Sequence, residues 1–230
     1  MGKEIEKIAV SRGHEILDKL DTPDDWIVRT SHLSQADMVL EFSTPGSVLG
    51  NIRRCFDLRL PIVVGTTGWH SQANLVKTWC AEENQSIFVA SNFSIGVNIL
   101  YNLTEKLSKI LDRFGNYDIS LEEIHHIHKL DSPSGTAINI AEIILNNLKR
   151  KESWVNHATV KPGELEIISH REGEIPGIHK IKCESETERL ILQHEAKGRQ
   201  GLAIGAILAA EWLKGKQGYF GMNDLLNLNE

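Results

Sequence analysis

The stretch LPIVVGTTGW, residues 60–69, gives the clearest indication of the fold class of the chain. Its first half is a short β-branched run, which is typical of a strand buried on both faces of a parallel sheet. Apolar runs of similar length lie on either side, at Met38–Phe42 and Ile87–Ala90, and a helix is expected at Gln72–Glu83. Short buried strands that alternate with helices indicate a parallel α/β sheet.

The N-terminal segment is expected to add a helix and a further strand. Met1–Arg12 carries apolar residues at helical spacing, and Gly13 follows where a left-handed backbone favours glycine. We expect a short strand at His14–Leu20, which ends at Asp21.

The pattern changes after about residue 95. The expected elements are, in order, a long helix at Val97–Phe114, a strand at Tyr117–His126, a helix at Thr136–Lys151, strands at 165–169, 179–185 and 188–196, and a helix rich in small residues at Leu202–Lys214. Consecutive strands without helices between them indicate an antiparallel or mixed sheet. The sequence therefore predicts an α/β fold, in which a Rossmann-like parallel sheet is joined to a second α+β domain that carries a mixed sheet.

Composition restricts the function classes. The 230 residues are 41% hydrophobic and carry a net charge of -6 without a long basic block, so we expect no nucleic-acid partner. The three cysteines lack metal-type spacing, which argues against a disulfide scaffold and for a reducing compartment. The longest apolar run, Leu202–Ala210, is too short to span a bilayer, and the charged N-terminus does not resemble a signal peptide. We expect a cytoplasmic globular protein with no membrane partner.

Three strand-to-loop junctions in the first half are rich in small polar residues. They are FSTPGS (42–47), GTTGW (65–69) and SNFSIG (91–96). In an open parallel sheet, ligands bind at the carboxyl ends of the strands, where small residues let the backbone approach them. Any one junction can be a simple turn, but three in succession favour a shared ligand crevice.

The densest polar cluster is EEIHHIHKLDSPSGTA, residues 122–137. Histidine exchanges protons near neutral pH, and Lys129 is a strong cationic donor. Ser134, Gly135 and Thr136 precede an apolar-periodic helix, so their backbone N–H groups are expected to be free to bind a carboxylate.

Two other interpretations of this cluster remain. His126 and His128 could share a face and hold a metal, but adjacent His125 and His126 point to opposite sides of a strand, and nothing completes a zinc tetrahedron. We therefore predict no metal. The cluster could also be a solvated strand edge.

The same residues resemble the substrate signature of the 4-hydroxy-tetrahydrodipicolinate reductase family, also called dihydrodipicolinate reductase. The family pattern E-x-H-H-x-x-K-x-D-x-P-S-G-T-A matches every fixed position from Glu123 to Ala137. FSTP (42–45), GTTGW and SNFSIGVN resemble the family's cofactor-side motifs, and REGEIPGIH (171–179), HEAKGR (194–199) and YFGMNDLL resemble later ones. A match of this length with ordered flanking motifs is far more specific than a lone glycine fingerprint.

The resemblance implies NAD(P)H-dependent reduction of a small cyclic dicarboxylate on the diaminopimelate route to lysine. It makes His125 the catalytic acid/base and Lys129 the proton donor to a ring carbon. The expected substrate-binding residues are His126, Ser134, Gly135 and Thr136. The residues expected to line the nicotinamide are Gly65, Thr66, Thr67, Ser91, Asn92, Phe93 and Ser94.

The resemblance also assigns the domains and the assembly. Residues 1–95 with 200–230 are expected to bind the dinucleotide, and residues 96–199 to bind substrate and to form a homotetramer through strands 165–196. Asp21, at the end of the expected second strand, is placed for the adenosine ribose. Thr22 and Pro23 follow Asp21, so no Arg or Lys is present there to bind a 2′-phosphate, which favours NADH over NADPH.

The chain departs from the family at its start. The family opens with a buried strand and a glycine-rich turn ending in Met-Gly, whereas this sequence begins at Met1-Gly2. We therefore expect a native chain longer by about ten residues, a strand plus a turn, and poor dinucleotide binding by the 230-residue chain. Two alternatives stay open, namely a non-catalytic remnant and an oxidoreductase of similar build acting on another substrate.

Overall fold

The chain folds into two compact units in a computed structural model that describes residues 1–228. The first unit comprises residues 1–95 and the C-terminal part from Gln200, and the second comprises Gly96–Arg199. Among the described residues, no helix combines the length and the hydropathy that crossing a membrane requires.

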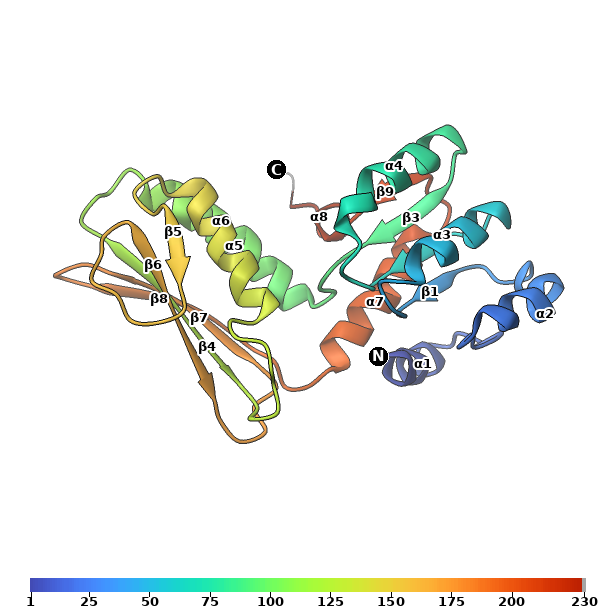
Figure 1. Ribbon diagram of the computed structural model, residues 1–230, viewed down its shortest axis with the longest axis horizontal. Helices are drawn as coiled ribbons and strands as arrows, with labels where there is room; N and C mark the ends of the chain where they lie inside the picture. The colour runs from blue at the N-terminus through green and yellow to red at the C-terminus, as the bar shows by residue number, and fades with distance from the viewer. Residues whose placement is uncertain (229–230) are drawn as a thin grey trace. The chain divides into compact units, whose positions relative to one another are not determined.

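The first unit is built on a four-stranded parallel sheet (Figure 1). Its strands, in spatial order, are β1 (Val39–Glu41), β2 (Ile62–Val64), β3 (Ser86–Val89) and β9 (Gly218–Phe220). The strands expected around residues 38–42, 60–64 and 87–90 are confirmed. Because all four run in parallel, the loops that follow β1, β2 and β3 leave from the same edge of the sheet.

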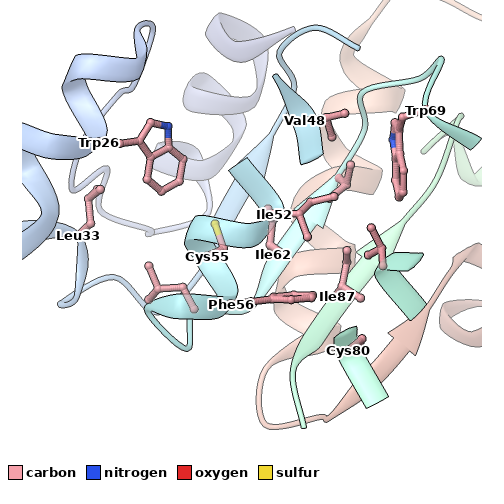
Figure 2. Packing of buried hydrophobic residues seen from close by; sticks show 13 residues of the cluster. Trp26, Leu33, Val48, Ile52, Cys55, Phe56, Ile62, Trp69, Cys80 and Ile87 are labelled. Carbon is pink, nitrogen blue, oxygen red and sulfur yellow. The ribbon is translucent and has the colours of Figure 1, made fainter. Parts of the chain in front are cut away.

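Helices cover both faces of this sheet. They are α1 (Gly2–Ser11), α2 (Pro23–Leu33), α3 (Val48–Asp57), α4 (Ala73–Glu82) after a 3-10 turn at His70–Gln72, α7 (Gln200–Leu213) and α8 (Met222–Leu225). Ile62 and Val64 pack with Ile52 and Phe56 of α3 on one face (Figure 2). Val63 points to the other face, into a cluster with α1 and α7. This alternation explains why the run at 60–64 is apolar throughout.

The strand expected at His14–Leu20 is wrong. Residues 14–20 form no strand, and no strand of the described sheet pairs with them. An apolar run becomes a strand only where a ladder partner satisfies its backbone. The preceding helix α1 is confirmed, and Gly13 has the expected left-handed backbone with φ +86.

Three helices (α2, α3 and the short α8) and a strand of this unit were not predicted. In α3 the four buried residues, Val48, Ile52, Cys55 and Phe56, recur at i, i+4, i+7 and i+8, so the amphipathic signal was present in the sequence. Helix α2 begins with a capping arrangement in which Asp25 accepts the backbone N–H of Thr22 at 2.8 Å. Strand β9 has only three residues and pairs with β3, far away in sequence, which no local pattern reveals.

The second unit is a mixed five-stranded sheet with two helices on one side (Figure 1). In spatial order the strands are β5 (Ser153–Val155), β6 (Glu164–Arg171), β4 (Asp118–His125), β7 (Ile178–Glu184) and β8 (Arg189–Glu195). β6 lies parallel to β5 and β4, and β7 runs antiparallel to β4 and β8. The predicted mixed sheet is confirmed, although the short β5 was not predicted.

Helices α5 (Ile95–Leu111) and α6 (Gly135–Asn147) supply the apolar side of the second core. Leu100 of α5 and Ile140 and Ile144 of α6 pack with Leu121 of the sheet. The expected helix over 136–151 ends at Asn147, because Lys151 lies in a turn where its buried ammonium donates to the carbonyl of residue 164 at 2.9 Å.

Candidate active site

Strand β4 carries two polar side chains at the end of an otherwise apolar stripe. Ile119, Leu121, Glu123 and His125 are buried and alternate with less buried residues, so all four face the helices. The register of the sheet then adds partners from distant sequence. His179 of β7 lies opposite Glu123, and Arg171 of β6 lies opposite His125.

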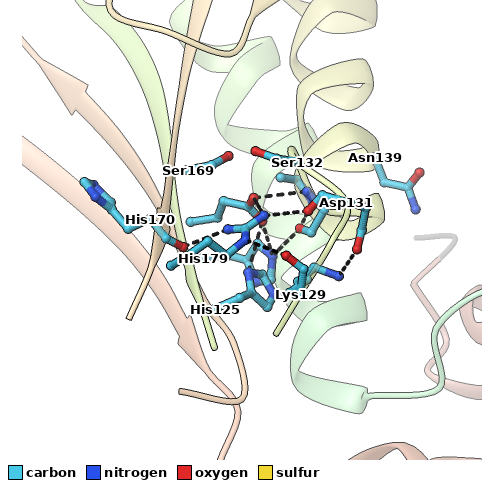
Figure 3. A network of polar contacts seen from close by, with 12 residues as sticks. His125, Lys129, Asp131, Ser132, Asn139, Ser169, His170 and His179 are labelled. Carbon is cyan, nitrogen blue, oxygen red and sulfur yellow. Dashed lines mark hydrogen bonds and ion pairs between the residues drawn. The ribbon is translucent and has the colours of Figure 1, made fainter. Parts of the chain in front are cut away.

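Glu123 is the centre of this cluster, in which it lies near His125 and His179. Figure 3 shows the two imidazoles side by side. Its side chain is fully buried. One oxygen, Oε1, accepts the backbone N–H of Ser134 at 3.1 Å and lies 3.2 Å from Nη2 of Arg171. The other oxygen, Oε2, lies 3.2 Å from Nδ1 of His125 and 3.8 Å from Nε2 of His179. The carboxylate therefore joins the strand, the start of α6 and two imidazoles.

The cluster fixes the charge of two of its members. Burial alone would raise the pKa of Glu123, but the neighbouring His125 imidazole and hydrogen bonds from Ser134 and Ser169 outweigh it and hold the pKa well below the usual range. Burial, followed by the nearby charge of His125, lowers the pKa of His179 to about 4. At neutral pH the site thus holds an ionised Glu123 beside a neutral His179.

Lys129 lies in the turn that follows β4. The carbonyl of His126 accepts the Lys129 N–H at 3.1 Å, and the Lys129 ammonium pairs with Asp131 at 2.9 Å. Arg171 holds this turn by donating to the backbone carbonyls of Asp131 at 2.6 Å and of Lys129 at 3.4 Å. Since Arg171 also contacts Glu123, the ammonium-bearing turn is tied to the carboxylate that faces His125.

The start of α6 forms another side of the site. The hydroxyl of Ser134 accepts the N–H of Ala137 at 3.2 Å and lies 3.1 Å from Nε2 of His179, and one hydroxyl can accept and donate in this way. The expectation of a free Ser134 N–H is wrong, because that group is donated to Glu123. Gly135 is exposed, and a Cβ built on it would meet nothing within 4 Å, so the first turn is open to a ligand.

A metal ion at this cluster would compete with Arg171 for the carboxylate of Glu123. Glu123, His125 and His179 are buried and offer ligand atoms within 4.8 Å of one another. However, the Arg171 guanidinium already contacts the same carboxylate, and its charge opposes a second cation. The rings of His126 and His128 lie 6.0 Å apart at their centroids. The absence of a metal stays a prediction.

In the first unit, the loops after β1 and β2 are bound to each other. The hydroxyl of Thr66 accepts the N–H of Ser43 at 2.8 Å, and Trp69 donates its indole N–H to the carbonyl of Thr66 at 2.7 Å. The N–H of Gly65 is donated to the carbonyl of Glu41 at 2.9 Å. A Cβ on Gly65 would lie 2.1 Å from the Phe42 ring, so only glycine allows this approach.

The loop after β3 packs closely against helix α7. Phe93 is buried, and its carbonyl would lie 1.8 Å from a Cβ built on Gly205 of α7. Asn92 accepts the N–H of Ser94 at 2.8 Å through its side chain. The small residues of α7 thus permit the close packing that the sequence indicates.

These loops fit the nicotinamide end of a dinucleotide. They share one edge of the sheet, Thr67 and Ser91 are exposed there, and Glu41 contributes a buried oxygen, Oε2, with no hydrogen-bond partner among residues 1–228. We expected Asp21 to end a strand, and this expectation is wrong. It is exposed in the turn before α2, where its N–H is donated to Asp25 at 3.0 Å.

Sequence reasoning missed two residues of the site and the role of a third. His179 and Arg171 were not singled out, because the sheet register that brings them to β4 is not visible in the sequence. Glu123 carried a usable signal, since a charged residue occupied an apolar-periodic position next to the histidines.

Family models match nearly the whole chain. Residues 1–93 match the model described as "Dihydrodipicolinate reductase, N-terminus", and residues 96–226 match "Dihydrodipicolinate reductase, C-terminus". A 4-hydroxy-tetrahydrodipicolinate reductase of Christiangramia forsetii is 40% identical over 227 residues, covering 99% of this chain and 94% of that protein. One from Neisseria meningitidis serogroup B is 34% identical over 204 residues, covering 86% and 75% respectively.

Solved structures share the fold. A dipicolinate-bound dihydrodipicolinate reductase from Paenisporosarcina sp. TG-14 aligns with a TM-score of 0.74 at 21% identity, covering 97% of this chain and 94% of that one. An amine dehydrogenase from Mycobacterium smegmatis aligns with a TM-score of 0.58 at 7% identity, covering 96% and 91%.

Proposed function

The chain belongs to the dihydrodipicolinate reductase family, and on that premise we propose that it reduces 4-hydroxy-tetrahydrodipicolinate, by way of dihydrodipicolinate, to tetrahydrodipicolinate. It is an oxidoreductase of lysine and diaminopimelate biosynthesis that uses a nicotinamide cofactor. The observation that carries the proposed chemistry is the cluster around Glu123, which joins His125, the Lys129 turn and the start of α6.

The substrate is a small cyclic dicarboxylate, and the second unit offers groups of the right charge. Gly135 and Thr136 begin α6, where the helix dipole favours a carboxylate. His126 and the Lys129 ammonium lie on the turn after β4 and would bind the substrate from a second side. Ser134 shapes this site through its capping hydroxyl rather than through its N–H.

The reduction adds a hydride and a proton across one double bond. When bound, the reduced nicotinamide supplies the hydride. Lys129 would deliver its ammonium proton to the adjacent ring carbon, where negative charge develops. His125 would act as the acid/base in this proton transfer, and its Nδ1 lies 3.2 Å from Oε2 of Glu123.

The cofactor would bind along the loops of the first unit. Gly65, Thr66 and Thr67 would line one side of the nicotinamide, and the other side would be lined by Ser91, Asn92, Phe93 and Ser94. Asp21 remains a candidate for the adenosine ribose from its exposed place in the turn before α2. The preference for NADH over NADPH rests on the absence of a cation at Thr22 and Pro23.

We propose a cytoplasmic homotetramer with no nucleic-acid or membrane partner. The sheet face of the second unit that points away from α5 and α6 mixes Ile168 and Ile191 with a charged patch. In that patch Glu122 pairs with Lys180 at 2.9 Å and with Lys182, and although burial opposes it, these partners lower the pKa of Glu122 to about 2. Such a face suits contact between copies through strands 165–196.

Two measurements test the proposed function. Calorimetry with NADH and NADPH is expected to show weak binding of both, tighter for NADH, and a steady-state assay is expected to show oxidation of either cofactor by the cyclic dicarboxylate. Failure to bind either dinucleotide would favour the non-catalytic alternative. Binding without turnover would favour an oxidoreductase that acts on another substrate.

A further inference from the structure

Glu123 has contacts that the proposed chemistry does not yet use. The residue is wholly buried, and each of its oxygens serves a different purpose. Oε1 holds the start of α6 through Ser134 and pairs with Arg171. Oε2 has no hydrogen-bond partner among the described residues, and neither does Nδ1 of His125, although the two atoms lie 3.2 Å apart. A small rotation of the imidazole would make each the partner that the other lacks.

The opposite side of the His125 ring is also fixed. A Cβ built on Gly177 would lie 3.0 Å from Nε2, so glycine leaves only enough room for the imidazole. The ring of His179 meets that of His125 edge to face, with centroids 5.1 Å apart. The imidazole therefore has one orientation, in which Nδ1 faces the carboxylate and Nε2 faces away from it.

Arg171 extends this arrangement to Lys129. Its guanidinium contacts Glu123 and donates to the carbonyls of Lys129 and Asp131. The groups that face His125 from the neighbouring elements are thus Glu123, His179 and, through its clamp on the turn, Arg171.

We propose that Glu123 is a positioning residue, whose carboxylate accepts the Nδ1–H of His125 and so keeps Nε2 as the atom that exchanges a proton. The imidazole orientation and the Lys129 turn then depend on one buried anion. The kinetic consequence rests on the proposed function, whereas the tautomer of His125 reports on Glu123 whether or not the chain is a reductase.

The test compares Glu123→Gln with Glu122→Gln. Glutamine at 123 keeps an oxygen for Ser134 and Arg171, but its amide N–H groups facing His125 would favour the Nε2–H tautomer. Glu122 is the neighbour on the same strand and points to the other face, where it pairs with Lys180 and Lys182. It is therefore the matched control for loss of one strand carboxylate.

We expect side-chain 15N NMR of neutral His125 to show Nδ1–H in the wild type and in Glu122→Gln, and Nε2–H in Glu123→Gln. In steady state, we expect Glu123→Gln to lower kcat about 100-fold with little change in the KM for the nicotinamide cofactor, since a wrongly oriented acid/base forfeits a factor of roughly 10² to 10⁴. A merely structural role would lower the folded fraction without changing the tautomer.

The Nε2–H tautomer in the folded wild type would overturn the proposal, even if Glu123→Gln did not fold. Turnover of Glu123→Gln within about twofold of the wild type would overturn it as well. A wild type that shows the Nδ1–H tautomer but no turnover would instead refute the proposed function and leave the role of Glu123 in orienting His125 supported.

Discussion

Acid should destabilise the second unit through His179. The side chain is buried, and burial together with the charge of His125 lowers its pKa from 6.5 to about 4. As the pH falls through this window, the unfolded chain takes up the His179 proton before the folded chain does. Because the unfolded state then binds more protons, stability decreases on acidification, whereas above pH 6.5 both states are neutral and this contribution is constant.

The size of the effect follows from the two pKa values. A pKa of about 4 in the folded chain against 6.5 in the unfolded chain costs about 2 kcal/mol at pH 5 and about 3 kcal/mol at pH 4. Glu123 adds to the loss at lower pH. Its pKa is depressed below 4.5 in the folded chain, so its stabilising contribution is present above that pH and disappears as it becomes protonated.

Amide hydrogen exchange at Leu121 and Ile181, in the centre of the sheet, measures the free energy of opening between pH 7 and pH 4. The matched variant is His179→Gln, which keeps an amide for the Ser134 hydroxyl but does not titrate. We expect the wild type to lose about 2 kcal/mol more than the variant between pH 7 and pH 5. An identical pH dependence in both proteins would refute the burial of a neutral His179.

Three further predictions concern packing, the Lys129 turn and assembly. Gly205→Ala should destabilise the chain by about 1–3 kcal/mol and weaken NADH binding in calorimetry, because the new Cβ meets the loop after β3. The control is Gly201→Ala, which adds a Cβ where no atom lies within 4 Å and should have neither effect. Asp131→Asn should lower kcat by about two- to fivefold, since its half-exposed ion pair with Lys129 is worth up to about 1 kcal/mol, and an unchanged rate would show that this pair does not position the ammonium. Ile168→Asp should reduce the mass found by light scattering below that of a tetramer, and an intact tetramer would exclude this face as the interface.

Local patterns in the sequence predicted much of the architecture. The β-branched run at 60–64 contains a strand buried on both faces, and the apolar-periodic segment that follows SPSGT became a helix. The strand expected at 14–20 failed because apolar residues do not form a strand without a ladder partner. The end of α6 was misplaced because the buried ammonium of Lys151 finds its partners on neighbouring strands rather than in the helix.

The sequence predicted only those candidate catalytic residues that lie within one continuous segment, residues 122–137. His125 and Lys129 belong to that segment, but their supports come from β6 and β7, more than forty residues away in sequence. The pairing of Glu123 with His179 depends on the register of an antiparallel ladder. That register is set by packing of the whole sheet, so no local motif contains it.

The proposed reduction depends on proton-transfer groups from the turn after β4 and from the end of that strand. Steady-state oxidation of reduced nicotinamide by the cyclic dicarboxylate, measured on Lys129→Ala and His125→Ala, tests this dependence. We expect each variant to lose about 100-fold or more in kcat, while calorimetry shows unchanged dinucleotide binding. Turnover close to that of the wild type in both variants would contradict it.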